Sequence, residues 1–146
     1  MKTAAQLVKL KAVHNQQVHS IAPDEMVLTA LKVMAEKNVG ALPVIDEGQV
    51  VGIISERDYA RKVVLQGRSS VGTPVRAIMS SPVVTAAGQH SIGRCMAVMT
   101  DSHLRHLPVV EDGKLLGLLS IGDLVKEAIS QQADLIEQLE QYIRGH

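Results

Sequence analysis

The stretch LPVIDEGQVVGIISERD at residues 42–58 recurs as LPVVEDGKLLGLLSIGD at residues 107–123. Working outward from it, residues 18–64 align with residues 83–129 without a gap, and apolar residues fall on apolar residues along most of the alignment. A match of this length indicates an internal repeat in which each copy is one structural unit. The predicted organisation is an N-terminal segment or helix at residues 1–17, a first unit at 18–70, a second unit at 71–130 and an amphipathic helix at 131–146.

Each unit shows the pattern strand, helix, strand, strand, helix. Residues 27–34 place four apolar side chains on one helical face, and residues 23–25, Pro-Asp-Glu, suit a helix start. Two apolar runs then flank the turn at residues 46–48 and predict a hairpin. Because so small a unit buries little core alone, we expect the two to bury each other's sheets. The sequence predicts an α/β (α+β) fold of two βαββα units, packed sheet to sheet about a pseudo-two-fold axis with helices outside.

The composition excludes several classes of function. The formal net charge is zero, with 15 Lys+Arg and 15 Asp+Glu, and the only aromatic residues are two Tyr. Binding to a nucleic-acid backbone relies on excess positive charge, and binding to single strands relies on aromatic stacking, so we expect no nucleic-acid partner. No apolar run is long enough for a membrane span or a signal peptide, and the lone Cys95 favours a reducing compartment. We therefore expect a cytoplasmic protein without a membrane partner. The six His show no metal-ligand spacing, so no metal site is expected.

The repeated Ser-x-x-Asp motif, Ser55 to Asp58 and Ser120 to Asp123, stands where a strand meets a helix. One interpretation is a capping box, in which the Ser side chain and the Asp side chain satisfy backbone N–H groups of the helix start. The other is a nucleotide site, because a helix N-terminus attracts phosphate and a carboxylate can accept from both hydroxyls of a ribose. The recurrence of the motif in both units favours the second interpretation.

Arg105-His106 precedes the second LPV motif, where the first unit has Gly40-Ala41. Arg105 can meet a phosphate in a bidentate way and His106 can add a donor, although a solvated loop is the alternative. The small Gly40-Ala41 leaves room for a ligand or for close packing, so the two sites are expected to differ. Arg57 and Arg61, one turn apart on a helix, suit phosphate or a solvated face.

The C-terminal residues 129–143 carry Ile and Leu at helical spacing. This pattern predicts an amphipathic helix after the second repeat. Two interpretations are open: the helix packs along its own chain, or it supports dimerisation.

The chain resembles the tandem CBS-domain pair, the module named after cystathionine β-synthase, and is similar to its small stand-alone bacterial members. The resemblance covers about residues 10–130. The residues that carry it are Val39-Gly40-Ala41-Leu42-Pro43-Val44, Gly52-Ile-Ile-Ser55-Glu-Arg-Asp58-Tyr59, Ile78-Met79-Ser80, Arg105-His106-Leu107-Pro108-Val109 and Gly117-Leu-Leu-Ser120-Ile-Gly-Asp123-Leu124.

The resemblance implies a cleft in each half that takes AMP, ADP, ATP, NAD or S-adenosylmethionine, and a homodimer that signals to a protein target. It also implies that Ser20 and Thr85, near the first strand of each unit, line the sites. Val18 with His19, and Val83 with Val84, would flank the adenine through apolar contact and backbone. Together with the residues above, the predicted nucleotide contacts are Val18, His19, Ser20, Gly40, Ala41, Leu42, Pro43, Ser55, Arg57, Asp58, Val83, Val84, Thr85, Arg105, His106, Leu107, Pro108, Ser120 and Asp123.

These observations predict a non-catalytic adenine-nucleotide sensor without a metal. The alternatives are a structural dimerisation module without a ligand, whose Ser-x-x-Asp motifs only cap helices, and an accessory of an enzyme such as IMP dehydrogenase. An enzyme is not expected: CBS pairs occur in IMP dehydrogenase, but that chemistry needs a catalytic barrel of about 250 residues, and no nucleophile–base pair is visible.

Overall fold

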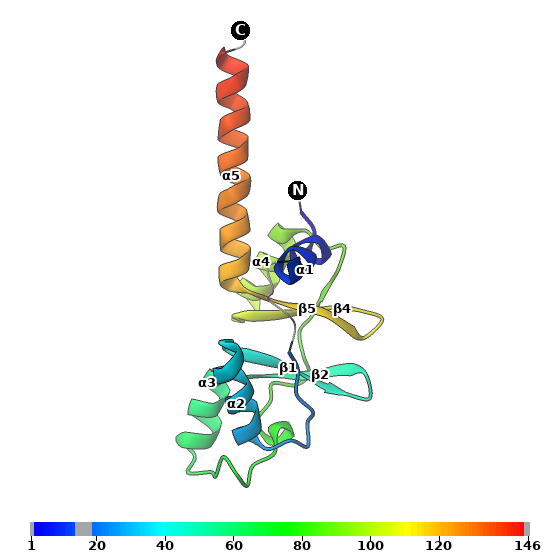
Figure 1. Cartoon of the computed structure of the whole chain (residues 1–146), viewed down its shortest axis with the longest axis vertical. Helices are drawn as coiled ribbons and strands as arrows, with labels where there is room; N and C mark the ends of the chain where they lie inside the picture. The colour runs from blue at the N-terminus through cyan, green and yellow to red at the C-terminus, as the bar shows by residue number, and fades with distance from the viewer. Residues whose placement is uncertain (1, 14–18, 145–146) are drawn as a thin grey trace.

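The computed structural model describes residues 2–13 and 19–144. Figure 1 shows two β-hairpins stacked on one another, with α2 and α3 outside one and α1, α4 and α5 outside the other. The elements are α1 (Ala4–Val13), α2 (Val27–Lys37), β1 (Ala41–Asp46), β2 (Gln49–Ser55), α3 (Glu56–Tyr59), its π-helical continuation η1 (Ala60–Val64), the 3-10 turn η2 (Val75–Ala77), β3 (Ala86–Ala87), α4 (Ile92–Asp101), β4 (His106–Glu111), β5 (Lys114–Ser120) and α5 (Ile121–Arg144).

The two hairpins have the same backbone geometry. Glu47 and Gly48 join β1 to β2 with φ of 50° and 79°, and Asp112 and Gly113 join β4 to β5 with φ of 53° and 78°. Positive φ at both central residues is the two-residue hairpin turn that matches strand twist. Each hairpin also has a register shift at the equivalent place, after Val44 in one and after Val109 in the other. The predicted α/β pair of related units is therefore confirmed.

The first strand of each unit is shorter than its apolar pattern suggests. In the second unit it is β3, which pairs in parallel with β4. In the first unit, among residues 19–21 that the structure describes, only Ile21 pairs, as a single bridge to Val44. Ile21 donates its N–H to the carbonyl of Pro43 (3.1 Å), but Pro23 follows two residues later and has no N–H to extend the ladder. Over residues 2–13 and 19–144 the sheets therefore have two and three strands.

The expected helix start at residues 23–25 is wrong. Those residues form a turn and a bend, and α2 begins only at Val27, after the N-cap Met26. The linker between the units supplies acceptors for the helix start: Val27 N–H donates to the carbonyl of Thr73 (2.9 Å) and Leu28 N–H to that of Ser70 (3.0 Å). Backbone carbonyls thus satisfy N–H groups that a side-chain cap would otherwise serve.

Each unit has its own apolar core, and α1 joins the core of the second unit. Ala4 and Leu7 of α1 are buried with β4, β5, α4 and the base of α5. A Cβ atom on Gly117 of β5 would lie 2.3 Å from a methyl of Val8, so only glycine permits this approach of helix to strand. Cys95 of α4 is fully buried in the same core. Helix α1 is therefore part of the core of the second unit.

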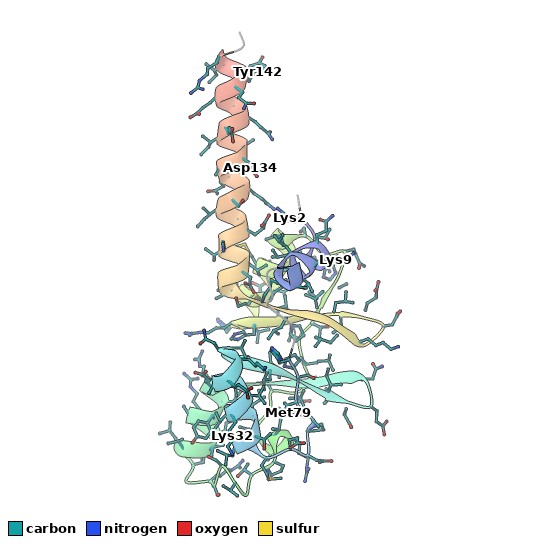
Figure 2. The ribbon with its side chains drawn as sticks, in the orientation of Figure 1. Lys2, Lys9, Lys32, Met79, Asp134 and Tyr142 are labelled. Carbon is teal, nitrogen blue, oxygen red and sulfur yellow. The ribbon has the colours of Figure 1, made fainter. Side chains whose placement is uncertain are left out.

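The last helix of the second unit and the expected C-terminal helix are one continuous element, α5, of 24 residues. Leu124 and Glu127 at its base are buried, and Lys2 pairs with Glu127 at 2.8 Å. From residue 129 to residue 144 every residue except Gln131 is exposed. Figure 1 shows this part of α5 standing away from the body, and Figure 2 places Lys2 beside its lower half and Tyr142 near its far end. The interpretation that the tail packs along its own chain is therefore wrong.

No helix within residues 2–13 and 19–144 combines the length and the apolar character needed to cross a bilayer.

Candidate functional site between the two units

A cavity of about 490 Å³ lies where the two units meet α1. Residues of the first unit, from the end of α2 into β1, form one wall. The junction of β5 with α5 and the side of α1 form another. The lining residues are Val8, Lys11, His19, Lys37, Asn38, Val39, Gly40, Ala41, Leu42, His106, Leu118, Ser120 and Asp123.

The structure brings seven of the predicted nucleotide contacts to this cavity and leaves the others elsewhere. Ser20, Arg57, Val84 and Arg105 are exposed, and Pro43, Leu107 and Pro108 are buried in β1 and β4. Val18 lies outside the described residues. The contacts in the cavity are His19, Gly40, Ala41, Leu42, His106, Ser120 and Asp123; Ser20, Pro43, Ser55, Arg57, Asp58, Val83, Val84, Thr85, Arg105, Leu107 and Pro108 are not among its lining residues.

Asp123 is the acidic group in the cavity wall. One of its oxygens, Oδ2, accepts from the N–H of Ser120 (2.7 Å) and from Nζ of Lys11 (2.7 Å). Lys11 also donates to the carbonyl of Leu118 (2.8 Å), so α1 is tied to β5 at this point. Partial burial by itself raises the pKa of Asp123, but the hydrogen bonds from Lys11 and Ser120 outweigh it and hold that pKa below its ordinary value. Asp123 is therefore an anion in the site, and among the described residues no hydrogen bond ends on its other oxygen, Oδ1.

Asp58, the equivalent carboxylate of the first unit, has a different environment. Its Oδ2 accepts from both the N–H and the hydroxyl of Ser55 (3.0 Å each), and its Oδ1 lies 3.2 Å from Nζ of Lys62. Ser55 in return accepts from the N–H of Asp58, which completes a capping box. Ser120 and Asp123 make the same reciprocal pair. The capping interpretation is thus confirmed for both units, and of the two carboxylates Asp123 is the one in the cavity wall.

His106 faces the first unit across the cavity. A Cβ atom on Gly40 would lie 3.8 Å from the imidazole Cε1, so the small residue of one unit stands against the larger residue of the other. Burial and the nearby Lys11 lower the pKa of His106 below 6.5. A neutral imidazole can donate one hydrogen bond to a phosphate and gains a second donor on protonation. Its neighbour Arg105 is exposed, so the predicted basic pair is divided between the cavity and the surface.

Lys11, Lys37 and Asn38 were not predicted as site residues. Lys11 lies outside the segment that repeats, so internal comparison gives no signal for it. Lys37 and Asn38 end α2, and Asn38 has a left-handed backbone with φ of 56°. Asn tolerates this conformation at the end of a helix. An Asn at this point of the sequence is therefore the one signal that could have placed Lys37 and Asn38 at the turn between α2 and β1.

We expect acid to destabilise the protein partly through His106. Because its pKa in the folded chain is below 6.5, the unfolded chain binds more protons between that pKa and 6.5, and the free energy of unfolding falls as the pH falls through this window. Urea unfolding at about pH 7.5 and about pH 5.5 measures the loss. His106→Gln should reduce it, whereas His103→Gln, on an exposed turn, should not. An equal loss in wild type and His106→Gln would contradict the assignment.

Within the described residues, no group of three or more His, Cys, Asp or Glu is gathered closely enough to hold a metal ion.

Comparison with known proteins places this architecture. The CBS domain family matches twice, at residues 10–65 and 75–130. The CBS domain-containing protein CBSX3, mitochondrial, of Arabidopsis thaliana is 40% identical over 127 residues, which cover 84% of this chain; the chain spans 62% of that protein's length.

Solved structures agree with the family match. A protein with CBS domains from Burkholderia ambifaria MC40-6 is 48% identical, with a TM-score of 0.82 over 90% of this chain and 96% of the other. CBSX2, solved in complex with AMP, is 27% identical, with a TM-score of 0.67 over 79% of this chain and 90% of the other. Two matched units, the repeated hairpins and these structures lead to one conclusion: the chain belongs to the CBS domain family and carries a pair of CBS domains.

Proposed function

We propose that the cavity binds an adenine nucleotide as a regulatory ligand and that the protein acts without catalysis. The observation that carries the proposal is the position of Asp123, an anionic carboxylate in the wall of a cavity whose other wall is Gly40 to Leu42 of the first unit. Its Oδ1 can accept from the ribose hydroxyls, while Lys37 and His106, which also line the cavity, can donate to a phosphate. The AMP complex of CBSX2 supports the ligand class.

The charges that line the cavity favour a monophosphate. Lys11 is neutralised by its ion pair with Asp123, and His106 is neutral at pH 7 because its pKa is lowered. Besides Lys11 and His106, the described lining residues include one more basic side chain, Lys37. We therefore place AMP ahead of ADP, ATP and NAD, since each added phosphate brings charge that this cavity does not balance.

Both units contribute to the cavity, so a bound nucleotide can favour one arrangement of the two. A ligand shifts such an equilibrium only by its differential affinity for the two states. We propose a cytoplasmic homodimer whose shape, or whose surface for a protein target, responds to the nucleotide.

The completed capping boxes favour a second candidate, a structural module without a ligand. A thermal-shift screen separates the two, because a ligand of the native state must raise stability, by about 2.7 kcal/mol at a concentration 100 times its Kd. We expect millimolar AMP to raise the Tm by several degrees, and 2′-deoxy-AMP, adenosine and inorganic phosphate to raise it less. No shift with AMP, ADP, ATP or NAD would support the structural module and contradict a nucleotide site.

A further inference from the structure

The projecting part of α5 carries an apolar face that its own chain does not cover. Ile129, Ile136 and Ile143 recur every seven residues and are 62%, 57% and 74% exposed, and Val125 and Leu139 on the same face are also exposed. A helix of about 15 residues without tertiary packing is only marginally stable in water. Apolar side chains at a seven-residue repeat are typical of helices that pair with another helix. We therefore expect this apolar face to pack against another helix.

We propose that a second copy of this chain covers the face, in an antiparallel pair of α5 helices centred near Asp134. In this register Val125 packs against the partner's Ile143, and Ile129 against the partner's Leu139. Gln132 then lies opposite the partner's Ile136 and is the one polar residue in the seam, a type of position that fixes register. This assigns an interface to the homodimer of the proposed function, but it needs no nucleotide.

Charge decides between an antiparallel and a parallel pair. In an antiparallel pair, a residue that flanks the seam lies beside a residue of the same heptad position on the partner. Lys126 and Glu140 occupy the same heptad position, so Lys126 lies beside the partner's Glu140 at both ends of the seam. A parallel pair in register would place Glu140 beside the partner's Leu135 and leave Lys126 without an acidic partner. Lys126 and Glu140 lie about 21 Å apart along one helix, so they cannot pair within a chain. Opposite charges thus match only in the antiparallel arrangement.

The body of the protein leaves the face accessible. Leu124 and Glu127 are buried toward the core, whereas Val125 and Ile129 are exposed on a different side of the same helix. Successive residues of a helix turn by about 100°, so the side with Val125 and Ile129 lies about 150° around the helix from the side with Leu124 and Glu127. Figure 1 shows α1 and α4 together on one side of the base of α5. A second helix can therefore lie along the apolar face beside the body.

A charge-exchange experiment on the full chain without nucleotide tests the pairing. Sedimentation equilibrium should show a wild-type dimer. Lys126→Glu and Glu140→Lys should each weaken it about tenfold, because each places two like-charged pairs in the seam. Mixing these two variants should restore the dimer, since Lys126→Glu and Glu140→Lys chains attract at both ends. Glu137→Lys, a matched reversal on the opposite side of the helix, should dimerise like wild type.

The proposal is overturned if wild type is monomeric, or if the mixed variants associate no better than either alone. Cross-linking with a short bismaleimide fixes the direction of the helices. Ala133→Cys should cross-link, because its two copies flank the seam within about 3 Å of each other along the axis. Ile143→Cys should not, because its two copies lie about 27 Å apart along the axis; the reverse result would show a parallel pair. The dimer experiments are done without nucleotide, so their outcome does not decide the thermal-shift test of nucleotide binding, and either proposal can fail without the other.

Discussion

Asp123→Ala should weaken AMP binding by about a hundredfold, because hydrogen bonds to a charged acceptor contribute about 1.5–3 kcal/mol and this carboxylate is the acceptor proposed for the ribose hydroxyls. Asp58→Ala is the matched control. It removes the same capping contacts from the first unit, but Asp58 does not line the cavity. We expect the control to bind AMP within about twofold of wild type, since it leaves the proposed contacts intact. Isothermal titration calorimetry measures both affinities.

Asp123→Ala also leaves Lys11 without its acidic partner, so the fold of the variant is checked first by circular dichroism and thermal unfolding. Asp123→Asn keeps the size of the side chain and one carbonyl acceptor, and should lie between wild type and Asp123→Ala in affinity. Equal AMP affinity in wild type and a folded Asp123→Ala would contradict the ribose assignment, and so would an equal loss in Asp58→Ala.

Leu42→Ala and Leu107→Ala should each lower the free energy of unfolding by about 2–5 kcal/mol, the range for removing a fully buried leucine side chain. The two leucines occupy equivalent places in the repeat and are 1% and 0% exposed, each in the core of its own unit. Urea unfolding with a check on the m-value measures the change. Leu65→Ala makes the same chemical change at a residue that is 76% exposed and should cost less than about 0.5 kcal/mol. A small effect at Leu107 would show that the second core is not packed as described.

The repeat made the fold predictable. Leu42 and Leu107 stand in hairpins of equal register because the same apolar pattern and the same two-residue turn occur twice. Local features that depend on distant segments were not predictable. The start of α2 is satisfied by carbonyls of the linker, which no pattern near Met26 reveals. The continuity of α5 joins a repeat helix to a tail that has no counterpart in the first unit.

The candidate site was predictable only in part, for a physical reason. A repeat predicts two equivalent carboxylates, but α1 packs on one unit alone, so Lys11 reaches Asp123 and not Asp58. Which side chains face the cavity is decided by how the units pack across each other. The residues that the motif carries, Ser120 and Asp123, are therefore in place, whereas Arg105 is exposed despite its position beside His106.

A crystal structure of the full chain with AMP tests the central claim most directly. We predict one nucleotide in the cavity between the units, with its ribose hydroxyls on Asp123 and its phosphate near Lys37 and His106. AMP bound instead beside Asp58 and Arg105, or a cavity that stays empty at saturating AMP, would contradict the account.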